Sequence, residues 1–291
     1  MVHSSLLPSV ASASAVACTL GGIALAAGLL ANYAARVEPG RVEVVRMTLP
    51  LPRLPANLDG LTLAQISDIH AGGVTGVEQV RRFVAMTNAL HPDITVITGD
   101  MFEHRFESAQ MSARELANLR APLGVYAIMG NHERHVPPEH GERPFRQAGL
   151  TVLCNAAHEV RADGASLWMV GLDDLLRGRG DLALALRGVP EGSCKVLLVH
   201  EPDLADDAAQ YPIDLQLSGH THGGQVRLPI IGPLILPALG RRYPMGLYQV
   251  GDTWVYTSRG LGMASPAVRL NCRPEITLFT LTCRGGNHAA T

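Results

Sequence analysis

Five short apolar runs in this sequence are each followed at once by side chains with oxygen or imidazole donors. Runs of this length, rich in Val, Ile and Leu, predict buried strands. One such donor at a strand end is ordinarily a turn or cap residue, whereas five in succession favour a shared site. The donors are Asp68 and His70, Asp100, Asn131 with His132 and Glu133, His200, and His220 with His222.

The stretches around these runs predict an alternation of strands and helices, that is, an α/β fold. Ligand sites of open α/β sheets lie at the carboxyl ends of the strands, which is where these donors would meet. The expected helices cover residues 77–90, 108–119, 145–148 and 181–186. The expected strands cover residues 42–49, 61–66, 94–98, 124–129, 195–199, 214–217, 247–250, 253–257 and 275–282, with 151–153, 158–161 and 166–171 assigned to a second sheet.

The last pair of donors, His220 and His222, has the clearest spacing. In an extended backbone their side chains point to the same side, because side chains alternate faces along a strand. Two neutral imidazoles that point into one space indicate a metal site. The flanking glycines, Gly219, Gly223 and Gly224, let the chain turn tightly and approach a ligand closely.

Composition excludes some classes of protein. The five cysteines are odd in number and lack C-x-x-C spacing, which argues against a disulfide framework and against a zinc–thiolate site. The net charge of −2 gives no bulk electrostatic reason to expect nucleic-acid binding.

The N-terminal segment has no Asp, Glu, Lys or Arg from Met1 to Ala35. Its apolar part, residues 10–35, is long enough to cross a bilayer as a helix. A cleavable signal peptide is the alternative, but its apolar region is usually ~7–15 residues behind a basic start. We therefore expect an uncleaved single-span anchor in the cell membrane. Arg36, Arg41 and Arg46 follow it, which predicts a cytoplasmic C-terminal domain.

The ordered set of strand-end donors resembles the calcineurin-like metallophosphoesterases over roughly residues 61–281. The run Gly-His-Thr-His-Gly-Gly-Gln at 219–225, with Leu-Asp-Gly-Leu-Thr at 58–62, is similar to a subgroup of membrane-associated bacterial phosphohydrolases. The resemblance implies a four-layer αββα sandwich of two mixed sheets, preceded here by one transmembrane helix. The expected domains are an anchor at 1–36, a linker and edge strand at 37–60, the metallophosphoesterase domain at 61–283, and a disordered tail at 284–291.

The resemblance also implies a dinuclear site. Asp68, His70 and His222 would hold one metal ion, and Asn131, His200 and His220 would hold the other. Asp100 would bridge the two ions. Oxygen and nitrogen donors without thiolate suit Mn, Fe or Zn. Two such ions lower the pKa of a bridging water, so that hydroxide attack on a phosphate is possible near neutral pH.

By the same resemblance, His132 lies beside the scissile bond, where it stabilises developing charge or protonates the leaving oxygen. Such a histidine needs an orienting carboxylate, and we expect Glu103 to supply it. The alternative is that Glu103 is a solvated loop residue. We expect Arg227, Arg259 and Arg269 to contact the substrate phosphate.

The segment 226–242 is apolar, contains three prolines and is flanked by arginines. It is too short to span a bilayer and too rich in proline for a core helix. Two interpretations stay open. It is either a buried crossover loop or a flap that enters the membrane interface or holds acyl chains.

Together these features predict a dinuclear-metal phosphoesterase that acts on a lipid-linked phosphate ester or pyrophosphate, with UDP-2,3-diacylglucosamine as a candidate substrate. One alternative is a phosphodiesterase or phosphomonoesterase for soluble nucleotides. Another is a non-catalytic metal-binding scaffold, although such relatives lose ligands, and none of the eight positions is missing here.

Overall fold

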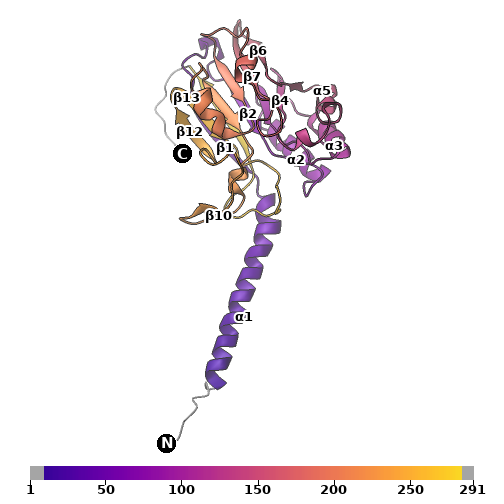
Figure 1. The fold of residues 1–291 in the computed structure, drawn as a ribbon, viewed down its shortest axis with the longest axis vertical. Coiled ribbons are helices and arrows are strands. Elements are labelled where there is room, and N and C mark those ends of the chain that lie inside the picture. The colour runs from indigo at the N-terminus through magenta and orange to yellow at the C-terminus, as the bar shows by residue number, and fades with distance from the viewer. Residues whose placement is uncertain (1–9, 284–291) are drawn as a thin grey trace, which may run out of the picture.

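The computed structural model describes residues 10–283, so residues 1–9 and the expected disordered tail at 284–291 lie outside the described residues. The chain begins with α1 (Val10–Asn32), which projects away from the domain as a single rod (Figure 1). A π-helical turn (Tyr33–Val37) and a 3-10 turn (Glu38–Gly40) continue it to the domain surface. The helical stretch Cys18–Gly40 is long and apolar enough to cross a membrane.

The first sheet has six strands in the order β1-β14-β2-β3-β4-β5. Within it, only β14 and β2 pair antiparallel among the described strands, and the other neighbours are parallel. The strands are β1 (Glu43–Pro50), β14 (Glu275–Thr282), β2 (Thr62–Ile66), β3 (Ile94–Thr98), β4 (Val125–Ile128) and β5 (Thr151–Val152).

The second sheet also has six strands, in the order β12-β13-β9-β8-β7-β6. Its two outer pairs are antiparallel and its inner strands are parallel. The strands are β12 (Gly246–Val250), β13 (Thr253–Thr257), β9 (Leu215–Ser218), β8 (Lys195–Leu198), β7 (Ala165–Gly171) and β6 (Ala156–Ala162). Both sheets are therefore mixed, as expected.

The main core lies between the two sheets. Leu63 and Val96 from the first sheet pack in one cluster with Met169 and Leu198 from the second. The period of two along each strand sends alternate side chains into this layer and out to the helices.

Helices cover the outer faces of both sheets. Val80 of α2 and Phe145 of α5 pack with Ile97 of the first sheet. On the other side, Leu182 of α6 packs with Leu197 of the second sheet. The helices are α2 (Val77–Asn88), α3 (Phe106–Leu116), α4 (Pro138–Gly141), α5 (Arg143–Gln147), α6 (Leu182–Ala185) and α7 (Ala205–Ala208), with 3-10 turns at Ala56–Leu58, Glu133–His135, Pro202–Leu204 and His222–Gly224. The predicted four-layer αββα sandwich is confirmed.

One strand was expected in the wrong sheet. Residues 151–152 form β5, which pairs with β4 at the edge of the first sheet rather than joining the second. The strand has two residues, which is too short to show the alternation of buried and exposed side chains that identifies a strand. Its place follows from α5, which returns the chain to the first sheet in parallel with β4, and sequence spacing could not show this.

The segment between the anchor and β2 is built into the domain. β1 pairs with β14 along its whole length, from Glu43 opposite Glu275 to Pro50 opposite Thr282. After it, Leu51, Leu54 and Leu58 are buried in the core between the sheets, in spite of the intervening prolines.

The segment 226–242 contains a small hairpin of β10 (Arg227–Leu228) and β11 (Gly232–Pro233). Its exposed large apolar side chains are Ile230, Ile231, Leu234, Ile235 and Leu239. The interpretation of this segment as a buried crossover loop is therefore wrong. In Figure 1 the hairpin projects from the underside of the domain, beside the end of α1.

Candidate metal centre

The predicted donors meet where strands of the two sheets end. Gln65 of β2 joins the sheets here, because its Nε2 donates to the Ser218 carbonyl of β9 at 2.9 Å. Beyond this bond, the loops after β2, β3 and β4 face the loops after β8 and β9. Five of the expected ligands have left-handed backbones, namely Asp68 (φ 49°), His70 (φ 49°), Asp100 (φ 52°), His220 (φ 71°) and His222 (φ 50°). Such conformations are uncommon outside glycine and gather at functional sites.

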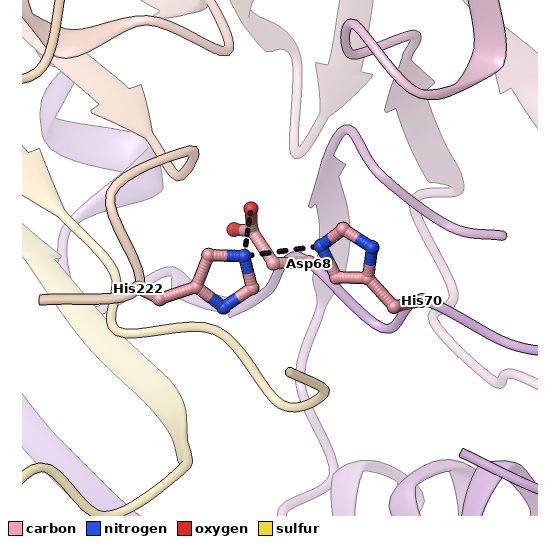
Figure 2. A group of neighbouring side chains, drawn as sticks. All are labelled: Asp68, His70 and His222. Carbon is pink, nitrogen blue, oxygen red and sulfur yellow. Dashed lines mark hydrogen bonds and ion pairs between the residues drawn. The ribbon is translucent and has the colours of Figure 1, made fainter. Parts of the chain in front are cut away.

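The first group of donors consists of Asp68, His70 and His222, all of them buried. The Nε2 atoms of His70 and His222 lie 3.0 Å apart, and His222 Nε2 lies 3.5 Å from Asp68 Oδ1 (Figure 2). Two imidazole nitrogens and a carboxylate that converge on one small volume are the donors of a divalent cation.

The second group consists of Asp68, Asp100 and His200. Asp100 Oδ2 lies 3.2 Å from His200 Nε2 and 3.6 Å from His70 Nε2. His200 Nδ1 donates to the Thr98 carbonyl at 2.7 Å. This bond fixes the orientation of the ring, so that Nε2 faces Asp100 and the site.

The remaining two expected ligands border the second group. Asn131 Oδ1 is buried and has no hydrogen-bond partner among the described residues. The His220 ring lies 4.9 Å from the His200 ring, measured between centroids. His220 Nε2 bonds to the Ala238 carbonyl at 2.9 Å, which leaves Nδ1 as its ligand atom. Within residues 10–283, His220 is outside the tight donor groups, so its part in the site rests on this neighbouring position.

Burial sets the protonation of two of the histidine donors. It lowers the pKa of His220 to about 4, and it holds the pKa of His222 well below the usual value for histidine. Both rings are therefore neutral at pH 7, which is the form that binds metals. Burial would raise the pKa of Asp100, but His200 and its neighbours outweigh burial and hold that pKa well below its usual range. The donor set fits divalent cations.

Glu103 connects the ligand His70 to His132. Its Oε2 lies 3.1 Å from His132 Nδ1, the contact expected from the sequence, and its Oε1 lies 2.7 Å from His70 Nδ1. Burial lowers the pKa of His132, yet the hydrogen bond to Glu103 and the charge of Asp100 outweigh burial and raise it. His132 is also partly exposed, unlike the buried ligands, so it can reach a substrate.

Two residues beside this pair had no role assigned to them from the sequence. The ring of His104 stacks on that of His132, with centroids 4.4 Å apart. Glu133 is buried, and its carboxylate accepts the backbone N–H groups of Asp100 (2.9 Å), Met101 (2.6 Å) and Gly130 (2.7 Å). Glu133 therefore fixes the loop after β3 against the loop after β4. The signal in the sequence was its position directly after Gly-Asn-His, which places Glu133 beside the expected ligands.

Gly130 allows these two loops to approach. A Cβ at this position would lie 2.3 Å from Asp100 Oδ1 and 2.8 Å from His200 Nε2. Any side chain there would displace two of the expected ligands.

The structure shows what each of the three arginines expected at the substrate contacts within the protein. Arg269 is fully buried and donates to the backbone carbonyls of Cys272 (3.0 Å) and Gly262, so it holds loops rather than phosphate. Arg259 pairs with Glu275 and Glu43, which neutralise its charge. Arg227 Nη1 donates to the Gly223 carbonyl at 2.8 Å, at the base of the β10–β11 hairpin.

Comparison with known proteins shows the family of the chain. Residues 61–224 match the family model described as calcineurin-like phosphoesterase. The chain belongs to this family and is a phosphoric ester hydrolase, which confirms the predicted class.

Three relatives show how far the likeness extends. The chain is 37% identical to the uncharacterized metallophosphoesterase YkuE of Bacillus subtilis, over 89% of this chain and 93% of YkuE. It is 30% identical to the phosphodiesterase YaeI of Escherichia coli, over 90% and 96%. It is 27% identical to the UDP-2,3-diacylglucosamine pyrophosphatase LpxG of Chlamydia muridarum, over 85% and 91%.

Proposed function

We propose that this phosphoesterase holds two divalent cations, Mn, Fe or Zn, and hydrolyses a phosphate ester or pyrophosphate of a lipid-linked substrate. The observation that carries the two-metal proposal is the position of Asp100, whose Oδ2 lies within 3.2 Å of His200 Nε2 and 3.6 Å of His70 Nε2. A carboxylate between two donor groups can bridge two cations. The proposed ligands are Asp68, His70 and His222 for one cation and Asn131, His200 and His220 for the other.

When bound, two cations lower the pKa of a water molecule and neutralise the phosphoryl oxygens. His132 is the proposed general acid, because its raised pKa and its exposure let it protonate the leaving oxygen. Glu103 orients His132 through Nδ1 and leaves Nε2 directed toward the site.

An apolar pocket supports the lipid-linked substrate. It has a volume of about 340 Å³, and it lies between the β10–β11 hairpin and the loop at 264–266. His220 and His222 line one end, while Val226, Leu234 and Ile235 line the hairpin side. A pocket that joins ligand histidines to aliphatic side chains suits a phosphate that carries an acyl chain. The first candidate substrate is UDP-2,3-diacylglucosamine, the compound that appears in the name of the relative LpxG.

We further propose that α1 is retained as a single-span anchor in the cell membrane and that the domain is cytoplasmic. The support is the uncharged segment up to Ala35, followed by Arg36 and Arg41 at the end that enters the domain.

The test compares the full chain with Asp100→Asn. Metal analysis of the full chain should give about two ions per chain, and the variant should retain about one, because a bridging ligand serves both ions. Hydrolysis of bis-p-nitrophenyl phosphate and of UDP-2,3-diacylglucosamine should be abolished. The matched control is Asp252→Asn, in the exposed turn between β12 and β13. One ion per chain in the unaltered protein, or full activity in Asp100→Asn, would contradict the dinuclear proposal.

The substrate is tested separately. Rapid hydrolysis of soluble nucleotides, with no reaction on UDP-2,3-diacylglucosamine or other lipid-linked phosphates in the panel, would exclude the lipid-linked class and leave the metal chemistry intact.

A further inference from the structure

We propose that the β10–β11 hairpin enters the phospholipid bilayer beside α1, as a second membrane contact. This inference rests on α1 being a membrane anchor, and it does not depend on the phosphoesterase reaction. The hairpin tip is here defined as Ile230, Ile231, Leu234 and Ile235.

The hairpin tip exposes a large apolar surface, which is unfavourable in contact with water. The exposed fractions are 107% for Ile230, 70% for Ile231, 54% for Leu234 and 73% for Ile235. No charged residue occurs from 228 to 240 in the sequence. Contiguous exposed aliphatic groups of this kind mark membrane or protein contacts.

The turn of the hairpin carries a residue that an aqueous turn would not favour. Ile230 has a φ of 70°. A β-branched residue in this left-handed region is a genuine outlier, and turns in water place Gly, Asn or Asp there. The turn therefore carries an aliphatic side chain in spite of its backbone cost.

The position of the hairpin indicates a bilayer as its partner. In Figure 1 the hairpin lies at the level of the domain end of α1 and projects sideways from it. If α1 crosses a bilayer, the hairpin lies at the surface of that bilayer. Arg227 and Arg241 flank the apolar stretch, where arginines suit lipid headgroups.

One segment joins the anchor to the hairpin base. The N–H of Arg269 donates to the Ala34 carbonyl (2.9 Å), and the N–H of Cys272 donates to Glu38 Oε1 (2.6 Å). Between these residues, Leu270 donates to the Gln225 carbonyl (2.8 Å) and accepts from the Arg227 N–H (2.9 Å). The end of the anchor and the base of the hairpin are therefore fixed to the same stretch of backbone.

The test places the photocrosslinker p-benzoylphenylalanine at Ile231 in the full chain, reconstituted in vesicles of phosphatidylethanolamine and phosphatidylglycerol. The matched control is the same substitution at Leu184, also exposed, on α6. Leu182 of that helix packs against the second sheet together with Ala157 of β6, and β6 lies far from α1 (Figure 1). We expect crosslinks to lipid from position 231 and none from position 184. No lipid crosslink at 231, or equal crosslinking at both positions, would overturn the proposal.

A second measurement needs no unnatural residue. Amide hydrogen exchange of residues 229–236 should be slower in vesicles for the unaltered chain than for a double variant, Ile230→Glu with Ile231→Glu. The shift should be about tenfold or more, because two charges at the tip oppose insertion. Exchange in the β6–β7 turn at Asp163 and Gly164 is the internal control, and equal exchange at 229–236 in both proteins contradicts insertion.

The outcomes separate this inference from the proposed reaction. Hydrolysis of bis-p-nitrophenyl phosphate without lipid crosslinks at position 231 leaves the reaction standing and removes the hairpin contact. Crosslinks at position 231 in a chain that hydrolyses no phosphate ester would support the hairpin contact and contradict the proposed reaction.

Discussion

At the scale of single residues, one carboxylate serves two histidines with different tasks. Glu103 contacts His70, an expected ligand, and His132, the proposed acid, through its two oxygens. A carboxylate behind a ligand histidine fixes the ring and makes it a better donor. We therefore expect Glu103 to couple metal affinity to proton transfer.

Replacing Glu103 by Gln should lower both properties. We expect metal affinity and kcat to fall about 10–100-fold, because an amide cannot accept from both imidazoles in the same way. The pH profile of kcat should also change, whereas loss of metal alone would leave the profile of the loaded enzyme unaltered. Glu107→Gln, exposed at the start of α3, is the control. An unaltered rate and pH profile would show that the two contacts of Glu103 contribute nothing to the reaction.

Gly130 should tolerate no side chain. Its Cβ would overlap Asp100 Oδ1 and crowd His200 Nε2, so Gly130→Ala should displace both groups. We expect a loss of bound metal and a destabilisation of about 1–3 kcal/mol, the usual cost of overpacking. Metal analysis and thermal unfolding test this. Gly192→Ala is the control, because a Cβ at Gly192 meets nothing within 4 Å. Full metal content in Gly130→Ala would mean that the loops move apart freely.

At the scale of elements, the loops of the site are held by a cation that is not in the site. The Arg269 guanidinium donates to the carbonyls of Arg259 (2.8 Å), Gly262 and Cys272 (3.0 Å). Gly262 in turn donates its N–H to the Asp68 carbonyl (2.6 Å). Arg269 thus supports the loop that carries an expected ligand.

Arg269→Met should therefore destabilise the protein by about 3 kcal/mol, because it leaves several buried carbonyls without donors. Thermal unfolding of the detergent-solubilised full chain measures the loss. Arg273→Met, at an exposed position on the same segment, should change the midpoint little. If the two variants unfold alike, the buried hydrogen bonds of Arg269 contribute nothing measurable.

At the scale of the whole molecule, the alternation of strands and helices could be predicted because buried strands and their polar ends are local patterns. The four-layer αββα sandwich was implied by the resemblance to a family, and most expected helices and strands lie where the structure has them. Asp68 and Asp100 could be named as candidate donors for the same reason, since each closely follows an apolar run.

What could not be predicted depends on contacts between distant parts of the chain. The burial of Arg269 is set by the carbonyls of Arg259, Gly262 and Cys272, in the irregular connection between β13 and β14, and no strand or helix pattern predicts that burial. The pairing of β5 depends on where α5 returns the chain. The exposure of Ile231 depends on how the hairpin leaves the domain, since an apolar stretch has the same composition when buried.

The junction between α1 and the domain also has a consequence for encounter with substrate. Ala34 and Glu38 accept hydrogen bonds from the backbone at 269–272, so α1 is connected rigidly to the domain rather than through a flexible linker. With the anchor in a bilayer, the donor cluster stands at one fixed height above the lipid. Its search for a lipid-borne phosphate is then two-dimensional, and lateral diffusion and surface density set the encounter rate. A water-soluble ester of the same chemistry gains nothing from that geometry.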